Sequence, residues 1–244
     1  MNPENVKDYF EKLQVVCDYA EATINVGLWN SEKIVFEKFI PKTAKILELG
    51  CGAGRIAFGL HKLGYTNLTA TDFSSGMVLA ARQIFESNNA NIDCFELDAV
   101  EPNLPKESFD AVIFGFNGLM QIPSETRRKK AITEIFSLLK SGGIFAFTTH
   151  DRDAAANADY WANEKKRWEN GVQQPILDEF GDIYYCGAHG NIYIHSPVKS
   201  QVEEALNEAG FVLSYCEFRR NISPESEAVE DFSDDCIFWV AKKK

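Results

Sequence analysis

Short apolar runs alternate with stretches of helical periodicity along the first 150 residues. Five runs have the length and apolar character of buried strands, and they cover residues 45–49, 68–72, 91–97, 109–116 and 144–150. Helical spacing fills most of the intervals between them, over residues 54–63, about 75–87 and 124–140. Because the run 109–116 is apolar almost throughout, the alternation predicts an α/β fold with a doubly wound, mostly parallel sheet.

The N-terminal residues 1–44 have the pattern of a helical cap. Apolar residues at helical spacing predict one amphipathic helix over residues 3–22. Ser31 is a suitable N-cap for a second helix over residues 32–40, which Pro41 ends.

The pattern changes after residue 150. Residues 151–196 contain a polar stretch, a predicted helix at 158–170 and two strand-like runs around a glycine-rich turn, and they form an insertion in a single domain that covers residues 1–244. A helix at 197–209 and strands at 211–218 and 236–242 follow. The acidic segment 223–235 between these strands is predicted to be a solvated loop.

Composition narrows the classes of partner. The net charge of −11 argues against nucleic acid, because phosphate binding needs a basic surface. No stretch reaches the roughly 20 apolar residues of a membrane span, and the charged N-terminus does not resemble a secretion signal. The six cysteines have no framework spacing and read as reduced thiols. We therefore expect a cytoplasmic protein, monomeric or homodimeric, that does not bind membranes.

The most distinctive stretch is ILELGCGAGR, in which an apolar run ends in Gly50, Gly52 and Gly54 and a helix follows. A strand, a glycine turn and a helix N-terminus present free backbone N–H groups to a ligand. The turn fits a purely structural role, a dinucleotide site or a site for S-adenosylmethionine (SAM). The dinucleotide fingerprint G-x-G-x-x-G fits less well, because the third glycine comes one residue early and Arg55 follows it.

Candidate ligand contacts lie at the predicted carboxyl ends of the later strands. Asp72 ends the second strand, where a carboxylate can accept both ribose hydroxyls of an adenosine, and Phe73 beside it offers an apolar face to adenine. Asp98 ends the third strand, and Phe114 and Asn117 end the fourth. Because ligands of open α/β sheets bind at this edge, the set favours the SAM interpretation.

The chain resembles class I SAM-dependent methyltransferases in five successive motifs, ILELGCGAGR, TATDFSSGM, ELDA, FDAVIFGFN and LKSGGIFAFTT, which span residues 45–150. The closing runs GFVLSYCEF and CIFWVAKK match more loosely. The resemblance implies a seven-stranded sheet whose last strand is antiparallel. It also implies an enzyme that uses SAM and releases S-adenosylhomocysteine.

The same resemblance implies the cofactor contacts. The glycine turn and Glu48 hold the methionine end, Asp72 the ribose, Phe73 and Met77 flank adenine, and Asp98 and Ala99 read its edge. An N-terminal segment around Trp29 closes the site. The full set comprises Trp29, Glu48, Gly50, Cys51, Gly52, Ala53, Gly54, Arg55, Asp72, Phe73, Met77, Asp98, Ala99, Phe114 and Asn117.

The methyl acceptor is less well defined, and we expect a small molecule. His150 follows the fifth strand and is the candidate general base, although a histidine at a strand end also serves as a hydrogen-bonded scaffold. The aromatic residues of the insertion either line an acceptor pocket or pack against a second subunit or the sheet edge. The candidate acceptor contacts are Trp29, Asn117, Asp151, Trp161 and Tyr193.

Other functions remain open on the sequence. The spacing of Cys186, His189 and His195 suggests zinc only weakly, because no fourth ligand lies nearby, and we expect no metal. A SAM-binding sensor or scaffold without transfer activity is the alternative from another class, and an NAD-type oxidoreductase fits less well. The motif N-P-P-Y, which is typical of amide or adenine methylation, does not follow the fourth strand, where the chain has FNGLMQI.

Overall fold

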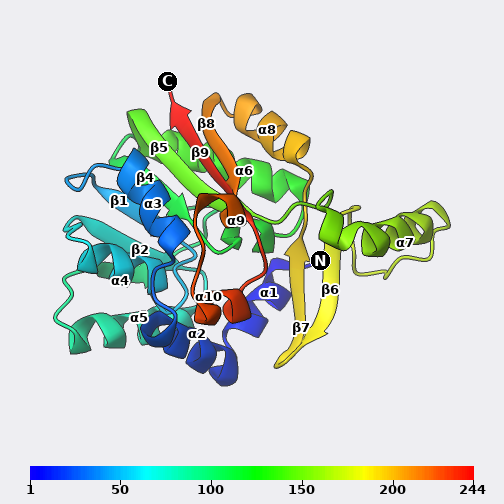
Figure 1. Ribbon diagram of the computed structural model, residues 1–244, viewed down its shortest axis with the longest axis horizontal. Helices are drawn as coiled ribbons and strands as arrows, with labels where there is room; N and C mark the ends of the chain where they lie inside the picture. The colour runs from blue at the N-terminus through cyan, green and yellow to red at the C-terminus, as the bar shows by residue number, and fades with distance from the viewer.

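Seven strands form one mixed sheet in the computed structural model, which describes residues 1–244 (Figure 1). They are β1 (Ile46–Leu49), β2 (Leu68–Asp72), β3 (Asp93–Glu96), β4 (Phe109–Phe114), β5 (Leu139–Thr149), β8 (Phe211–Phe218) and β9 (Ile237–Lys243). Their order is β3-β2-β1-β4-β5-β9-β8, and β9 runs antiparallel to both of its neighbours. The predicted seven-stranded sheet with an antiparallel last strand is confirmed.

Helices cover both faces of the sheet, each over its own apolar core. One face packs against α3 (Asn30–Phe39), α4 (Arg55–Lys62) and α5 (Ser75–Ser87), and the other packs against α6 (Glu125–Leu138) and α8 (Lys199–Glu208). Successive strand residues alternate between the cores, as Ile46 and Leu47 do, because side chains of a strand point to opposite faces. The helix predicted to reach residue 140 ends at Leu138, since Leu139 already pairs with Phe109 of β4.

Two helices replace the single one predicted over residues 3–22. They are α1 (Pro3–Phe10) and α2 (Leu13–Asn25). At the break between them, the Glu11 carboxylate accepts hydrogen bonds from the backbone N–H groups of Ser75, at 2.7 Å, and Gly76, at 3.2 Å. A carboxylate at the positive end of a helix is favourable, so Glu11 fastens the cap to α5 at the point where the chain bends.

A buried ion pair ties α3 to the helix that follows the glycine turn. The Arg55 guanidinium donates to both carboxylate oxygens of Glu32 at 2.7 Å, and to the Gly27 carbonyl at 2.8 Å. Glu32 also accepts from the Trp29 backbone N–H at 2.9 Å, so α3 begins at Asn30 and not after Ser31 as predicted. The side chain of Arg55 therefore serves the architecture of the cap.

The insertion contains α7 (Ala158–Glu169), β6 (Asp182–Gly187) and β7 (Gly190–His195). The hairpin of β6 and β7 contacts α1, whereas α7 projects to one side of the molecule (Figure 1). The helix and the hairpin predicted for this segment are confirmed.

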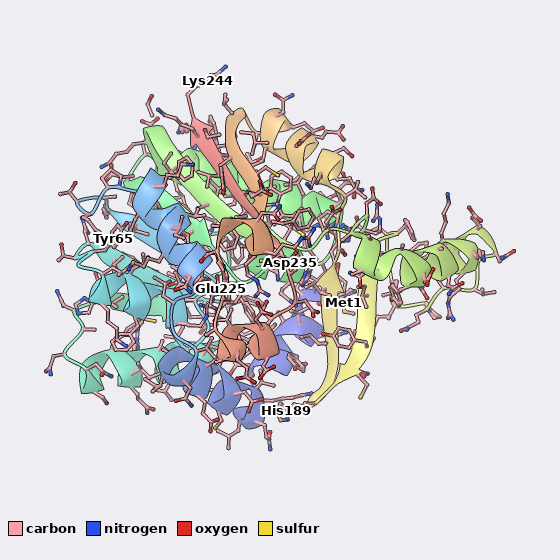
Figure 2. All side chains as sticks on the ribbon, viewed as in Figure 1. Met1, Tyr65, His189, Glu225, Asp235 and Lys244 are labelled. Atoms are coloured by element: carbon pink, nitrogen blue, oxygen red, sulfur yellow. The ribbon has the colours of Figure 1, made fainter.

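The acidic segment 223–235 is not the solvated loop predicted from its charge. It follows the short helix α9 (Arg219–Ile222), contains α10 (Glu227–Phe232), and buries Val229 in the core. The Glu225 carboxylate accepts from the backbone N–H groups of Asn30, at 2.9 Å, and Ser31, at 2.8 Å. Glu225 thus fixes segment 223–235 to the N-terminus of α3, and Figure 2 shows Glu225 next to that end of the helix.

Replacing Glu32 by Gln tests the buried ion pair. We expect Glu32→Gln to lower the free energy of unfolding by about 3–5 kcal/mol, because Arg55 would stay buried without its counter-charge. Urea denaturation followed by circular dichroism measures the change. Glu37→Gln is the matched control, since Glu37 lies on the same helix and pairs with Lys42 in solvent. Equal stability of the two variants would contradict a structural role for the pair.

Candidate functional site

A cavity of about 290 Å³ lies at the carboxyl edge of the sheet. The strand order reverses between β1 and β4, and open α/β sheets bind their ligands in the crevice outside such a reversal. The glycine turn and the ends of β2 and β4 line one side of the cavity, and α1, the hairpin and residues 232–234 line the other. Figure 1 shows these segments gathered around the same edge.

The glycine turn comes close to its neighbours because it lacks side chains. Gly50 and Gly52 have φ angles of +60° and +54°. A Cβ on Gly50 would lie 2.7 Å from Cε2 of Phe114, and one on Gly52 would lie 2.9 Å from Cδ1 of Tyr19. Both glycines line the cavity, so a side chain at either position would also take ligand space.

Asp72 joins the glycine turn to the end of β2. Its carboxylate accepts from the backbone N–H of Gly52 at 2.7 Å and of Ser74 at 2.8 Å. Burial raises the pKa of Asp72 to about 6, although these N–H groups act in the opposite direction. Asp72 lines the cavity and keeps free lone pairs toward it, since each carboxylate oxygen can accept two hydrogen bonds.

A second carboxylate, Asp98, lies at the same end of the cavity with Phe73, Met77 and Ala99. It accepts from the Val100 backbone N–H at 2.8 Å and from Nη2 of Arg127 at 3.2 Å. This end of the cavity therefore combines two carboxylates with apolar side chains, an arrangement that suits an adenosine.

In the basic run Arg127–Lys130 on α6, Lys129 and Lys130 pair with surface glutamates, but Arg127 and Arg128 do not form a solvated helix face. Arg127 lines the cavity beside Asp98, and Arg128 is buried with its guanidinium 2.8 Å from the Glu179 carboxylate. The roles of these two arginines could not be identified from the sequence, because their carboxylate partners lie on distant segments.

His150 and Asn117 lie together toward the opposite end. The His150 Nδ1 lies 3.2 Å from the Asp235 carbonyl oxygen, which can only accept, so Nδ1 carries the proton. Nε2 then accepts from the Asn117 amide at 3.2 Å, and the Asn117 Oδ1 has no partner in the protein. Burial lowers the pKa of His150, so the imidazole is neutral at pH 7.

The backbone before Asn117 is strained. Phe116 and Asn117 have φ angles of +48° and +59°, in the left-handed region that side chains other than glycine seldom adopt. The Thr148 hydroxyl accepts from the Asn117 backbone N–H at 2.8 Å and holds the turn. Strain of this kind is typical of functional sites.

Four of the predicted cofactor contacts lie beside the main cavity. Glu48, Cys51, Ala53 and Arg55 line a small adjoining space of about 30 Å³, behind Gly50 and Gly52. The Glu48 carboxylate accepts from the Ala57 backbone N–H at 2.8 Å, and burial raises the pKa of Glu48 well above its usual range. Gly54 lines neither space, because it packs against the Phe85 ring.

Four of the predicted acceptor contacts also lie away from the cavity lining. Trp29 is buried behind Phe116, with the ring centroids 5.8 Å apart. Trp161 packs on Phe180 inside the insertion, and the Tyr193 hydroxyl donates to the Asp182 carboxylate at 2.7 Å. The Asp151 carboxylate caps its own turn at the backbone N–H of Asp153. Of the predicted acceptor contacts, only Asn117 lines the cavity.

Sequence reasoning missed several side chains that do line the cavity, among them Tyr19 and Phe232, whereas Tyr185 is one of the insertion aromatics for which an acceptor pocket was one of the expected roles. Phe232 is the one aromatic residue of a strongly acidic segment, which was the available signal. Tyr19 lies on α2 and Tyr185 on β6, and only the tertiary fold brings them together.

The histidines and the cysteine of the weak zinc motif do not converge. His189 bonds to the Asp18 carboxylate at 2.7 Å, and Cys186 is exposed. His195 lies with Asp182 and Glu179, but Nδ1 of His195 is hydrogen-bonded to Asp182 at 2.9 Å.

Known proteins share this sequence and fold. A family described as "Methyltransferase domain" matches residues 46–143. A methyltransferase-family protein of Geobacillus sp. (strain WCH70) is 30% identical over 227 residues, which cover 82% of this chain and 84% of the relative. The chain belongs to the class I SAM-dependent methyltransferases.

Other relatives agree with this membership. The demethylmenaquinone methyltransferase of Listeria monocytogenes serotype 4a is 28% identical over 85% of this chain and 87% of the relative. The malonyl-acyl-carrier-protein O-methyltransferase of Paenibacillus sp. (strain JDR-2) is 29% identical over 71% of this chain, but the match spans only 57% of that relative. A SAM-dependent methyltransferase structure from Methanosarcina mazei shares the fold, with a TM-score of 0.69 at 19% identity, over 86% of this chain and 96% of that one.

Membership makes SAM the cofactor, and the site geometry is compatible with it. The glycine turn leaves backbone room that any Cβ would fill, and Asp72 and Asp98 face one end of the same cavity. None of the helices has the length and apolar character that a membrane crossing requires.

The raised pKa of Asp72 predicts a pH dependence of SAM affinity. A carboxylate accepts ribose hydroxyls best when ionised, and a group with a pKa of about 6 is mostly protonated at pH 5. We expect SAM to bind about tenfold more weakly at pH 5 than at pH 7, measured by isothermal titration calorimetry.

Two variants separate Asp72 from His150 in this experiment. Asp72→Asn should bind SAM weakly at both pH values, whereas His150→Gln should keep the pH dependence of the wild type. A wild-type affinity that does not change between pH 5 and pH 7 would refute the assignment.

Proposed function

We propose that this SAM-dependent methyltransferase transfers the methyl group to a small-molecule acceptor. The observation that carries the proposal is the shape of the site. Asp72 and Asp98 at one end and Asn117 and His150 at the other line one cavity of about 290 Å³, which α1, the hairpin and residues 232–234 cover. A folded macromolecule could not reach the far end of such a cavity without displacing these segments.

The placement of the side chains supports an assignment of the cofactor contacts. We assign the ribose hydroxyls to Asp72, the adenine edge to Asp98 and Ala99, and the adenine faces to Phe73 and Met77. The methionine end belongs beside Gly50 and Gly52, where Glu48 and Arg55 line the small adjoining space. Phe114 lies under the glycine turn and supports it.

The bound cofactor supplies an electrophilic methyl group, and its sulfur leaves without charge. The protein therefore contributes orientation of the reactants and exclusion of water. The glycine turn on one side, and Phe116 and Phe232 on the other, keep water out of the path between the acceptor and the methyl group. The neutral His150 can accept a proton at Nε2 only if the Asn117 amide stops donating its hydrogen bond to that atom. The Oδ1 of Asn117, which has no partner in the protein, would then help to stabilise the protonated ring.

The names of the relatives indicate acceptors of different chemistry. One is a malonyl-acyl-carrier-protein O-methyltransferase and another is a demethylmenaquinone methyltransferase. Neither name identifies the acceptor atom that this protein methylates. A monomeric or homodimeric state and a cytoplasmic location remain predictions.

A transfer assay tests the proposal. Purified protein is incubated with methyl-labelled SAM and a fractionated cell extract, and we expect label to appear in the small-molecule fraction. Asp72→Ala, which weakens cofactor binding, should abolish the signal. Label in protein or nucleic acid alone, or no transfer from a protein that binds SAM, would contradict the proposal.

His150→Gln tests the proton-accepting role. Gln can still accept the hydrogen bond of Asn117 but cannot take a proton, so turnover should fall by roughly 100-fold or more while SAM affinity stays within twofold. His61→Gln is the control, since His61 lies in the last turn of α4, outside the cavity. Unchanged turnover would leave His150 as a scaffold residue.

A further inference from the structure

Among the side chains that line the cavity near His150, the buried polar atoms without a partner are hydrogen-bond acceptors. Asn117 is 4% exposed, and its Oδ1 has no partner in the protein. The amide cannot be turned around, because its Oδ1 would then face the unprotonated Nε2 of His150. Gln121 lines the same cavity, and its Oε1 is also buried without a partner. A buried acceptor without a donor is costly, so these atoms favour a ligand that brings hydrogen-bond donors, such as the N–H groups of an ammonium.

Aromatic rings surround the same part of the cavity. Phe116 and Phe232 stack with their centroids 4.8 Å apart at an angle of 9°. Tyr19 meets both rings edge-on, at 6.0 and 6.3 Å, and Tyr185 stands half-exposed at the mouth. Phe116 already has the Arg55 guanidinium 5.7 Å from its ring centroid, so the rings left for a ligand cation are those of Phe232 and Tyr185, and aromatic ring faces attract cations through their quadrupole.

The charge at this end of the cavity is negative. Asp234 lines the cavity, is exposed to solvent and forms no ion pair in the structure. Burial raises the pKa of Tyr185, and the Asp234 carboxylate raises it further. The Asp234 charge therefore lies close to the Tyr185 ring. The two cations that line the cavity belong to the adenosine end and are already paired, Lys7 with Glu96 at 2.6 Å and Arg127 with Asp98 at 3.2 Å.

A carboxylate acceptor would therefore find no unpaired cation among the side chains that line the cavity, whereas a cationic acceptor would meet the Asp234 carboxylate. The net charge of −11 adds a long-range attraction for cations.

We infer that the methyl acceptor is a cationic amine, held by the rings of Phe232 and Tyr185, by Asp234 and by the free Oδ1 of Asn117. The inference rests on the proposed function and names its acceptor class. The ammonium first loses one proton, to water or to Nε2 of His150. Its lone pair then forms the N–C bond while the C–S bond breaks, and the electron pair of that bond stays on sulfur.

Three probes of one shape test the head group. They are 2-phenylethylamine, 2-phenylethanol and 3-phenylpropanoate, which carry a cation, a neutral hydroxyl and an anion on similar aromatic arms. Binding is measured by calorimetry on protein already saturated with S-adenosylhomocysteine. S-adenosylhomocysteine, whose sulfur is uncharged, then occupies the cofactor site, so the titration measures binding at the acceptor site alone.

The expected result is an order of affinity. We expect the amine to bind at least tenfold more tightly than the alcohol, and the acid to show no binding. Asp234→Asn should weaken the amine about tenfold without affecting the alcohol. Asp231→Asn removes the same charge from an exposed position of α10 outside the cavity, and it should bind the amine like the wild type.

Other outcomes overturn the inference. These are equal or tighter binding of the alcohol or the acid, no binding of the amine, or unchanged amine affinity in Asp234→Asn. The proposed function fails separately, when methyl-labelled SAM binds but transfers no label to any extract fraction. Amine binding with no transfer would thus refute the function and keep the binding site.

Discussion

The turn after β1 can lie against the sheet edge only because three glycines leave no side chains in the way. A Cβ on Gly54 would come within 2.4 Å of the Phe85 ring, and one on Gly50 within 2.7 Å of Phe114. The Asp72 carboxylate holds the turn through the Gly52 N–H, at the cost of a pKa raised by burial. The helix that follows, the small space around Glu48 and the floor of the main cavity all depend on this close approach.

The cover of the cavity is assembled from distant segments through contacts to backbone groups. Glu11 binds the N-terminus of α5, Glu225 binds the N-terminus of α3, and Arg219 donates to the Ser233 carbonyl at 2.9 Å. His150 adds a bond to the Asp235 carbonyl. Because separate polar contacts hold the cover while the sheet is buried on both faces, an opening for ligand exchange would involve the cover before the sheet.

Most of the fold was predictable from the sequence, because the buried strands and the glycine turn are encoded locally. Five apolar runs and the positions of Asp72 and Asp98 located the carboxyl edge. The break at Glu11 and the folding of residues 223–235 were not predictable, since they depend on contacts with α5 and α3.

The acceptor side was the least predictable part of the site for the same reason. Trp161 and Tyr193 were candidates for their aromatic character, but the insertion uses them for its own packing. Tyr19, Tyr185 and Phe232 come from three separate segments, and no local pattern brings them together.

We expect the site to accept one adenosine with a methionine arm and not a dinucleotide. A thermal-shift comparison of S-adenosylhomocysteine with NADH tests this most directly. The account predicts that S-adenosylhomocysteine raises the melting temperature in a concentration-dependent way and that NADH does not. Stabilisation by NADH without stabilisation by S-adenosylhomocysteine would contradict it.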